Sequence, residues 1–85
     1  MKALNHIPDP PADFEQDQAA LWYRYAHTLQ RKGLLYRERL PLLEVYTIGM
    51  HLLDRAIELR IGLNDDIQFV YDTTVSVGRE LVRKK

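Results

Sequence analysis

The sequence predicts an all-α fold, a three-helix antiparallel bundle-like domain with an irregular N-terminal arm. Apolar residues recur at spacings of three and four in three separate segments, which is the period of an amphipathic helix. Glycine or proline stands at the joints between these segments. The 85 residues suffice for one small domain and not for two. We therefore expect an arm over residues 1–11, one helical domain over 12–85, and helices at about 13–32, 40–61 and 65–83.

The arm and the start of the first helix are predicted from local sequence. Pro8, Pro10 and Pro11 cannot lie in a helix interior and favour extended backbone. Asp9 or Asp13 can cap the first helix, and Asp13, followed three residues later by Gln16, has the form of a capping box, so we expect the helix to begin at about residue 13. The apolar stripe of this helix consists of Phe14, Leu21, Trp22, Tyr25, Ala26 and Leu29.

The second helix is expected to be the central one. Gly33 ends the first helix, Pro41 lies in the first turn of the second, and Gly62 stops the second after Ile61. Gly49 in the middle of a helix indicates that another helix crosses closely there. The apolar set is broader than one neighbouring helix can cover: Leu42, Leu43, Val45, Tyr46, Ile48, Leu52, Leu53, Ala56, Ile57, Leu59 and Ile61.

The third segment is interpreted as a helix, with a strand as the competing interpretation. Asn64 and the two aspartates after it are candidate caps. The seam has the spacing of a heptad and consists of Ile67, Val70, Thr74, Val77 and Leu81. Residues 73–77 are rich in β-branched side chains, which favour strands. We prefer the helix because the seam continues past Gly78.

Apolar surface left over on the second and third helices predicts self-association of the chain, because a domain this small buries little of its surface. A homo-oligomer is therefore the expected state. The candidate interface residues are Val45, Ile48, Leu52, Leu59, Val70 and Val77.

Composition excludes several classes of function. Lys and Arg (12) balance Asp and Glu (12), so there is no overall field to attract nucleic acid or a membrane, and any such contact needs a local patch. The absence of cysteine excludes disulfides, a thiol nucleophile and a thiolate metal site. No run approaches the roughly 18 apolar residues of a membrane span, and no signal peptide is evident. We expect a cytoplasmic protein without a membrane partner.

The sequence shows no machinery for catalysis. His51, Asp54 and Glu58 share one helical face and have the residue types of a metal site, but a solvated polar edge is the simpler interpretation. Ser76, the only serine, does not lie in a glycine-flanked elbow, and no glycine-rich phosphate loop is present. We expect no enzyme activity, no cofactor and no bound metal.

Two basic groups could contact phosphates. One surrounds the first interhelical connector and the other ends the chain, and together they give the DNA-binding candidates Arg31, Lys32, Arg37, Arg39, Arg79, Arg83, Lys84 and Lys85. The competing interpretation is that these cations only complement helix C-termini and aid solubility. The connector from residue 33 to 39 is too long for a helix-turn-helix motif.

Three segments carry a resemblance to a known family: WYRYAHTLQRKGLL at residues 22–35, LLEVY at 42–46 and AIELRIG at 56–62. Together they resemble the P27-type small terminase subunits of tailed phages and prophages, which share a tryptophan-bearing helix, a Gly-Leu-Leu stop, Leu-Glu-x-Tyr near the start of a helix and a closing glycine. The resemblance covers about half of the chain. The family usually has an acidic residue where Arg39 stands and commonly continues beyond the third helix, whereas this sequence ends at Lys85.

The resemblance implies a non-catalytic component of viral DNA packaging. Such proteins form rings, recognise double-stranded DNA at the packaging site, and engage a large terminase subunit that supplies ATPase and nuclease activity. The alternative is a small helical interaction or regulatory module that does not bind nucleic acid. A helical metalloprotein using His51, Asp54 and Glu58 is a distant third interpretation.

Overall fold

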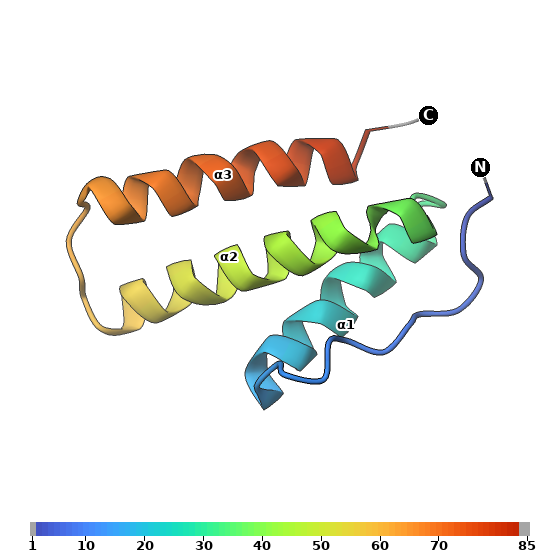
Figure 1. The fold of residues 1–85 in the computed structure, drawn as a ribbon, viewed down its shortest axis with the longest axis horizontal. Coiled ribbons are helices and arrows are strands. Elements are labelled where there is room, and N and C mark those ends of the chain that lie inside the picture. The colour runs from blue at the N-terminus through green and yellow to red at the C-terminus, as the bar shows by residue number, and fades with distance from the viewer. Residues whose placement is uncertain (1, 84–85) are drawn as a thin grey trace.

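A computed structural model describes residues 2–83 and confirms the all-α fold. Its elements are α1 (Gln16–Arg31), the short 3-10 helix η1 (Arg37–Arg39), α2 (Leu40–Glu58) and α3 (Asp65–Leu81) (Figure 1). No strand forms within residues 2–83, so the strand interpretation of the third segment is wrong and the helix interpretation is confirmed. Over the same residues, none of the helices combines the length and the apolar character needed to cross a bilayer.

The second helix is central, as predicted. Both α1 and α3 pack against α2, and successive helices run in opposite directions (Figure 1). The core is concentrated where α1, the connector and the first half of α2 meet the end of α3. Its buried members are Trp22, Ala26, Leu29, Leu34, Leu35, Leu43 and Leu81.

The N-terminal arm is irregular, as predicted, and it packs along α1. The Leu4 amide donates a hydrogen bond to the Leu35 carbonyl (2.7 Å), and the Trp22 Nε1–H donates one to the Pro8 carbonyl (2.9 Å). Leu4, Ile7 and Phe14 contact the core. The arm therefore covers the core residues of α1 and forms part of the packed domain.

The start of α1 lies later than predicted. The Phe14 amide donates to the Pro11 carbonyl (3.1 Å), closing a turn that contains Asp13. The capping-box interaction forms two residues farther on, where the Gln18 side chain accepts from the Glu15 amide (2.8 Å). The predicted Asp13 cap is wrong because a local turn uses that segment before the helix begins.

The end of α1 follows the prediction. Gly33 has a φ of 70°, in the left-handed region, and its amide donates to the Gln30 carbonyl (3.0 Å). The Leu34 amide donates to the Leu29 carbonyl (2.9 Å), and the Leu34 side chain enters the core. These two hydrogen bonds and the apolar contact form a Schellman motif.

The end of α2 differs from the prediction. The helix ends at Glu58, and Arg60 takes the left-handed conformation (φ 55°) that was expected of a glycine stop at Gly62. The Ile61 amide donates to the Ala56 carbonyl (2.9 Å), again as in a Schellman motif. A side chain in this conformation is strained, because Cβ crowds the backbone. The hydrogen bonds hold Arg60 in this conformation despite that strain.

Two glycines set the distance between α2 and α3, as expected for Gly49. A Cβ atom added to Gly49 would overlap Thr74 Oγ1 and lie 3.1 Å from Thr74 Cβ. A Cβ atom on Gly78 of α3 would lie 2.8 Å from Cε1 of Tyr46 on α2. Each helix thus contributes one glycine to the close contact.

We predict that Gly49→Ala destabilises the fold. Thr74 is buried, so the added methyl group must push α2 and α3 apart, at a cost of about 1–3 kcal/mol. The better helix propensity of alanine offsets about 1 kcal/mol of that cost. Urea denaturation of both proteins measures the difference. Gly62→Ala is the control because open space surrounds Gly62, and its effect should stay within about 1 kcal/mol. Equal stabilities of Gly49→Ala and Gly62→Ala would contradict the close packing.

Candidate nucleic-acid interface

The two basic groups, far apart in sequence, meet at one end of the molecule. The C-terminal ends of α1 and α3 and the connector between α1 and α2 all lie at that end (Figure 1). We call this the basic end. Its exposed cations are Arg31, Lys32, Arg37, Arg79 and Arg83. Lys84 and Lys85 lie outside the described residues.

Arg39 is not available to DNA, which corrects its prediction as a DNA-binding residue. Its side chain is buried, with 5% of its surface exposed. Nη1 donates to the Leu81 carbonyl (2.7 Å), and Nη2 donates to the carbonyl of Arg83. The guanidinium also lies 5.0 Å from the centre of the Tyr36 ring, a cation–π contact. Arg39 therefore fastens the end of α3 to the connector and so holds the basic end together.

The opposite end of the molecule is acidic. α3 begins there and α2 ends there, and both contribute carboxylates, whereas α1 begins nearer the middle of the molecule, beside α2 (Figure 1). Aspartates in the first turns of α1 and α3 complement the positive ends of those helix dipoles. The acidic residues at this end are Asp54, Glu58, Asp65 and Asp66, and the start of α1 adds Asp13, Glu15 and Asp17 nearer the middle of the molecule. A chain with no net charge thus has two ends of opposite sign.

Most of the aromatic side chains serve packing. Trp22 is buried, and Phe14 meets its ring edge-on at 6.1 Å. Tyr25 of α1 packs edge-on against Tyr46 of α2 at 5.0 Å. Burial, together with the nearby Tyr46 and Asp54, raises the pKa of Tyr25. Tyr23 is exposed, and its hydroxyl donates to Asp9 (3.2 Å) on the arm.

His51 is not part of a solvated edge, which corrects that interpretation. Its ring is buried, and Nε2 lies 2.8 Å from Oδ2 of Asp17 on α1. The hydrogen bond from His51 is the main cause that holds the pKa of Asp17 below its ordinary value. Asp54 and Glu58, the other members of the predicted trio, are exposed and lie outside this pair. Sequence reasoning missed Asp17 because the pairing depends on how α1 is rotated against α2.

The carboxylates around His51 are already engaged by protein groups. Glu15, Asp17 and His51 bring one potential ligand atom each to within 4.8 Å of one another. His51 bonds Asp17, and Arg55 lies 3.6 Å from Glu15. This arrangement is a charge network that joins the start of α1 to α2, and it provides no further argument for a metal.

The predicted interface residues fall into two groups. Val45, Leu52 and Leu59 are exposed at seven-residue spacing, so Val45 and Leu52 share one outer face of α2 and Leu59, directly after the last residue of α2, continues it. Ile48 lies half-buried beside that face. Val70 and Val77 are half-buried on the seam that faces α2, and Val77 contacts the core. The outer face of α2 is thus the part of the prediction that a second molecule could reach.

No family model, curated protein or solved structure matches the chain. The resemblance to small terminase subunits therefore rests on the sequence segments alone.

We predict that Arg39→Ala lowers the free energy of unfolding by about 2–3 kcal/mol, because two carbonyl groups near the end of α3 lose a charged donor. Arg39→Lys should recover part of this loss, since an ammonium group lacks the fork that reaches both carbonyls. Arg37→Ala is the matched control, because Arg37 is exposed and its loss should change stability by less than about 0.5 kcal/mol. Urea denaturation compares the three. If Arg39→Ala and Arg37→Ala were equally stable, the fastening role would be wrong.

A second prediction concerns acid. The pKa of Asp17 is lower in the fold than its ordinary value of 3.8, so the unfolded chain binds this proton more readily. The Asp17–His51 contact therefore stabilises the fold above about pH 3.8 and loses its contribution as the pH falls through the lower, folded value. Asp17→Asn should destabilise the protein at neutral pH, and this difference should vanish in acid. Urea midpoints across that pH range test this.

Asp13→Asn is the control for the acid experiment, because Asp13 lies in the exposed turn before α1. A destabilisation by Asp17→Asn that stays constant from neutral to acid pH would contradict the assignment.

Proposed function

We propose that the protein is a non-catalytic, self-associating component of phage or prophage DNA packaging. In this proposal the chain contacts double-stranded DNA through its basic end and engages a large terminase subunit. The convergence of Arg31, Lys32, Arg37, Arg79 and Arg83 at one end is the observation that supports DNA contact. The sequence resemblance supplies the packaging role.

The basic end suits the DNA backbone better than the composition suggests. Its cations are exposed, so their side chains can approach phosphates without losing an existing protein contact in the core. Arginine can bind a phosphate through two parallel hydrogen bonds, and all of these cations except Lys32 are arginines. Two exposed carboxylates, Glu38 of the connector and Glu80 of α3, also lie at the basic end, and Glu80 pairs with Arg83 (3.3 Å), but the five exposed cations outnumber them. Binding of this kind reads the backbone and needs no recognition motif.

A second candidate is a helical protein-interaction module without nucleic-acid binding. Large apolar side chains are exposed where α2 and α3 are joined, far from the basic end: Ile57, Leu59, Ile61, Leu63 and Phe69. Exposed apolar surface of this extent marks protein contact sites in many proteins. In the first proposal the same surface could bind the large terminase subunit. Only DNA binding therefore distinguishes the DNA-packaging proposal from the interaction-module proposal.

DNA binding should be measured with a short duplex by fluorescence anisotropy across a series of salt concentrations. We expect affinity to fall steeply with salt, because binding releases counterions from the phosphates. Replacing Arg31 and Lys32 by alanine removes two exposed cations at the basic end. The salt slope should then fall by about 2, since each phosphate contact contributes about 0.9.

The matched control replaces Arg24 and Arg60 by alanine, which removes the same charge away from the basic end. This variant should keep the salt slope of the original protein. If the original protein showed no binding at low salt, the interaction-module alternative would replace the DNA proposal. Equal losses in both variants would mean that DNA binds without preference for the basic end.

A further inference from the structure

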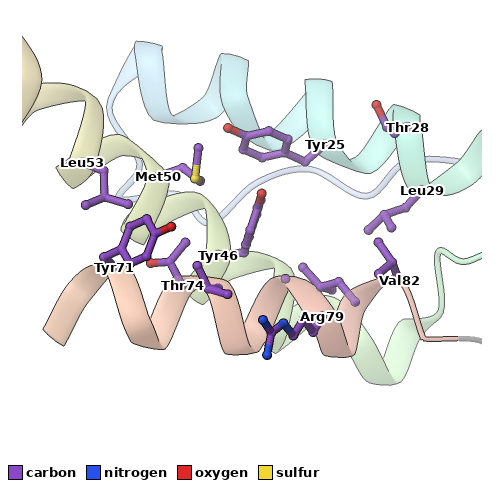
Figure 2. A pocket seen from close by; sticks show the side chains of 13 residues that line it. Tyr25, Thr28, Leu29, Tyr46, Met50, Leu53, Tyr71, Thr74, Arg79 and Val82 are labelled. Atoms are coloured by element: carbon purple, nitrogen blue, oxygen red, sulfur yellow. The ribbon is translucent and has the colours of Figure 1, made fainter. Parts of the chain in front are cut away.

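An apolar groove of about 410 Å³ lies between α1 and α3, with α2 as its floor (Figure 2). Tyr25 and Leu29 form the wall on α1, and Tyr46, Met50 and Leu53 form the floor. Figure 2 shows these side chains pointing into the space between the two outer helices. The lining is almost entirely apolar, which is costly for a surface left in water.

The wall on α3 has the pattern of a helix-pairing seam. Its groove-lining residues include Tyr71, Val75, Gly78 and Val82, at spacings of four, three and four. Such spacing produces one continuous stripe and is the seam of coiled coils. Gly78 also lies against Tyr46 of α2, but Tyr71, Val75 and Val82 are not members of the seam that faces α2, so α3 has a second apolar face. Tyr71 and Val82 are each about half exposed, at 52% and 53%.

Charged residues flank this second stripe with opposite signs at its two ends. Asp72 lies toward the start of α3 and Arg79 toward its end. Seven residues separate them, so they share one side of the helix, next to the stripe. Arg79 lies at the rim of the groove (Figure 2), and Asp72 accepts a hydrogen bond from Gln68 one turn earlier (2.9 Å).

We propose that α3 of a second copy of this chain fills the groove, antiparallel to the first α3 and related to it by a two-fold axis. The inference rests on the self-association proposed above and names its surface. Each α3 then lies in the groove of the other copy, and the two stripes of Tyr71, Val75 and Val82 pack together. Two-fold pairs are the commonest symmetric oligomers, and each such contact buries the same surface on both copies.

The charges select the antiparallel direction. The stripe has its midpoint between Val75 and Gly78, so an antiparallel partner sets Tyr71 opposite the partner's Val82. In that register Asp72 comes within about two residues of the partner's Arg79, roughly 3 Å along the helix axis, and symmetry makes this pair twice. A parallel partner related by a two-fold axis would instead place this flank of the two copies on opposite sides of the seam, so neither Asp72–Arg79 contact could form. Only the antiparallel arrangement therefore gains the two opposite-charge contacts.

This face is distinct from the interface expected from sequence. Val45, Leu52 and Leu59 lie on the outer face of α2, whereas Tyr46, Met50 and Leu53 form the floor of the groove. The groove offers walls on both sides as well as a floor, so an inserted helix loses water around most of its apolar stripe. The outer face of α2 has only a single convex row of side chains.

The test uses charge reversal at exposed positions and light scattering for mass. The original chain should have the mass of two copies, about twice 10.0 kDa. Asp72→Arg should set cation against cation, and Arg79→Asp should set carboxylate against carboxylate, so each variant alone should have the mass of one copy. An equimolar mixture of the two variants should regain the mass of two copies, because each of the two contacts then joins an arginine of one variant to an aspartate of the other.

Two control variants show whether the groove, and no other surface, holds the pair together. Glu80→Arg makes the same kind of charge reversal, and helical spacing places Glu80 on the side of α3 away from the groove, so the pair should persist. Leu52→Glu alters the outer face of α2 and should also leave the pair intact. Circular dichroism of each variant confirms that it is helical before its mass is interpreted.

Several results would overturn the inference. The first is a single-copy mass for the original chain. The second is a two-copy mass for both Asp72→Arg and Arg79→Asp. The third is a single-copy mass for Leu52→Glu. DNA binding is measured separately. A monomer that binds duplex DNA in a salt-dependent way would therefore contradict the proposed α3 interface but not the proposed DNA contact. A stable two-copy assembly with no affinity for DNA would contradict the DNA contact but not the α3 interface.

Discussion

The buried guanidinium of Arg39 ties the two halves of the helical domain together at one end. It joins the connector between α1 and α2 to the carbonyl groups at the end of α3, 42 residues farther along the chain. Without that link, α3 would be held mainly by its contact with α2. The antiparallel order of the helices brings cations from both halves of the sequence to one end, where this link fastens them and removes Arg39 from the solvent.

The close contact between α2 and α3 has a second consequence. Gly49 and Gly78 let the two helices approach closely, because the side chains of Thr74 and Tyr46 occupy the space that a side chain at either glycine would need. α1, by contrast, meets α2 through bulky residues such as Leu29 and Leu43, and through the Asp17–His51 contact at its other end. The unequal spacing on the two sides of α2 leaves the groove between α1 and α3. A fourth helix in that space would complete a bundle of the kind that buries apolar faces on every side.

Sequence reasoning succeeded where a single local pattern decides the structure. The period of the apolar residues identified all three helices, Pro41 marked the start of α2, and the cost of a glycine at position 49 indicated the close crossing. It failed where two neighbouring segments can form alternative local structures, and where a residue far away in the sequence determines where a side chain lies. The turn at Asp13 displaced the first cap, Arg60 replaced Gly62 at the end of α2, and Arg39 was assigned to the surface. No local pattern shows that a long side chain will reach a carbonyl group on another helix. The candidate site was therefore only partly foreseen: its exposed cations follow from the sequence, but their meeting at one end does not.

The docking of the arm on α1 gives this molecule a built-in optical reporter. Trp22 is the only tryptophan, it is almost fully buried, and its indole nitrogen bonds the Pro8 carbonyl of the arm. Detachment of the first residues would expose that indole to water while the helices stayed folded. Red-shifted fluorescence emission with unchanged far-ultraviolet ellipticity would therefore distinguish release of the arm from melting of the domain.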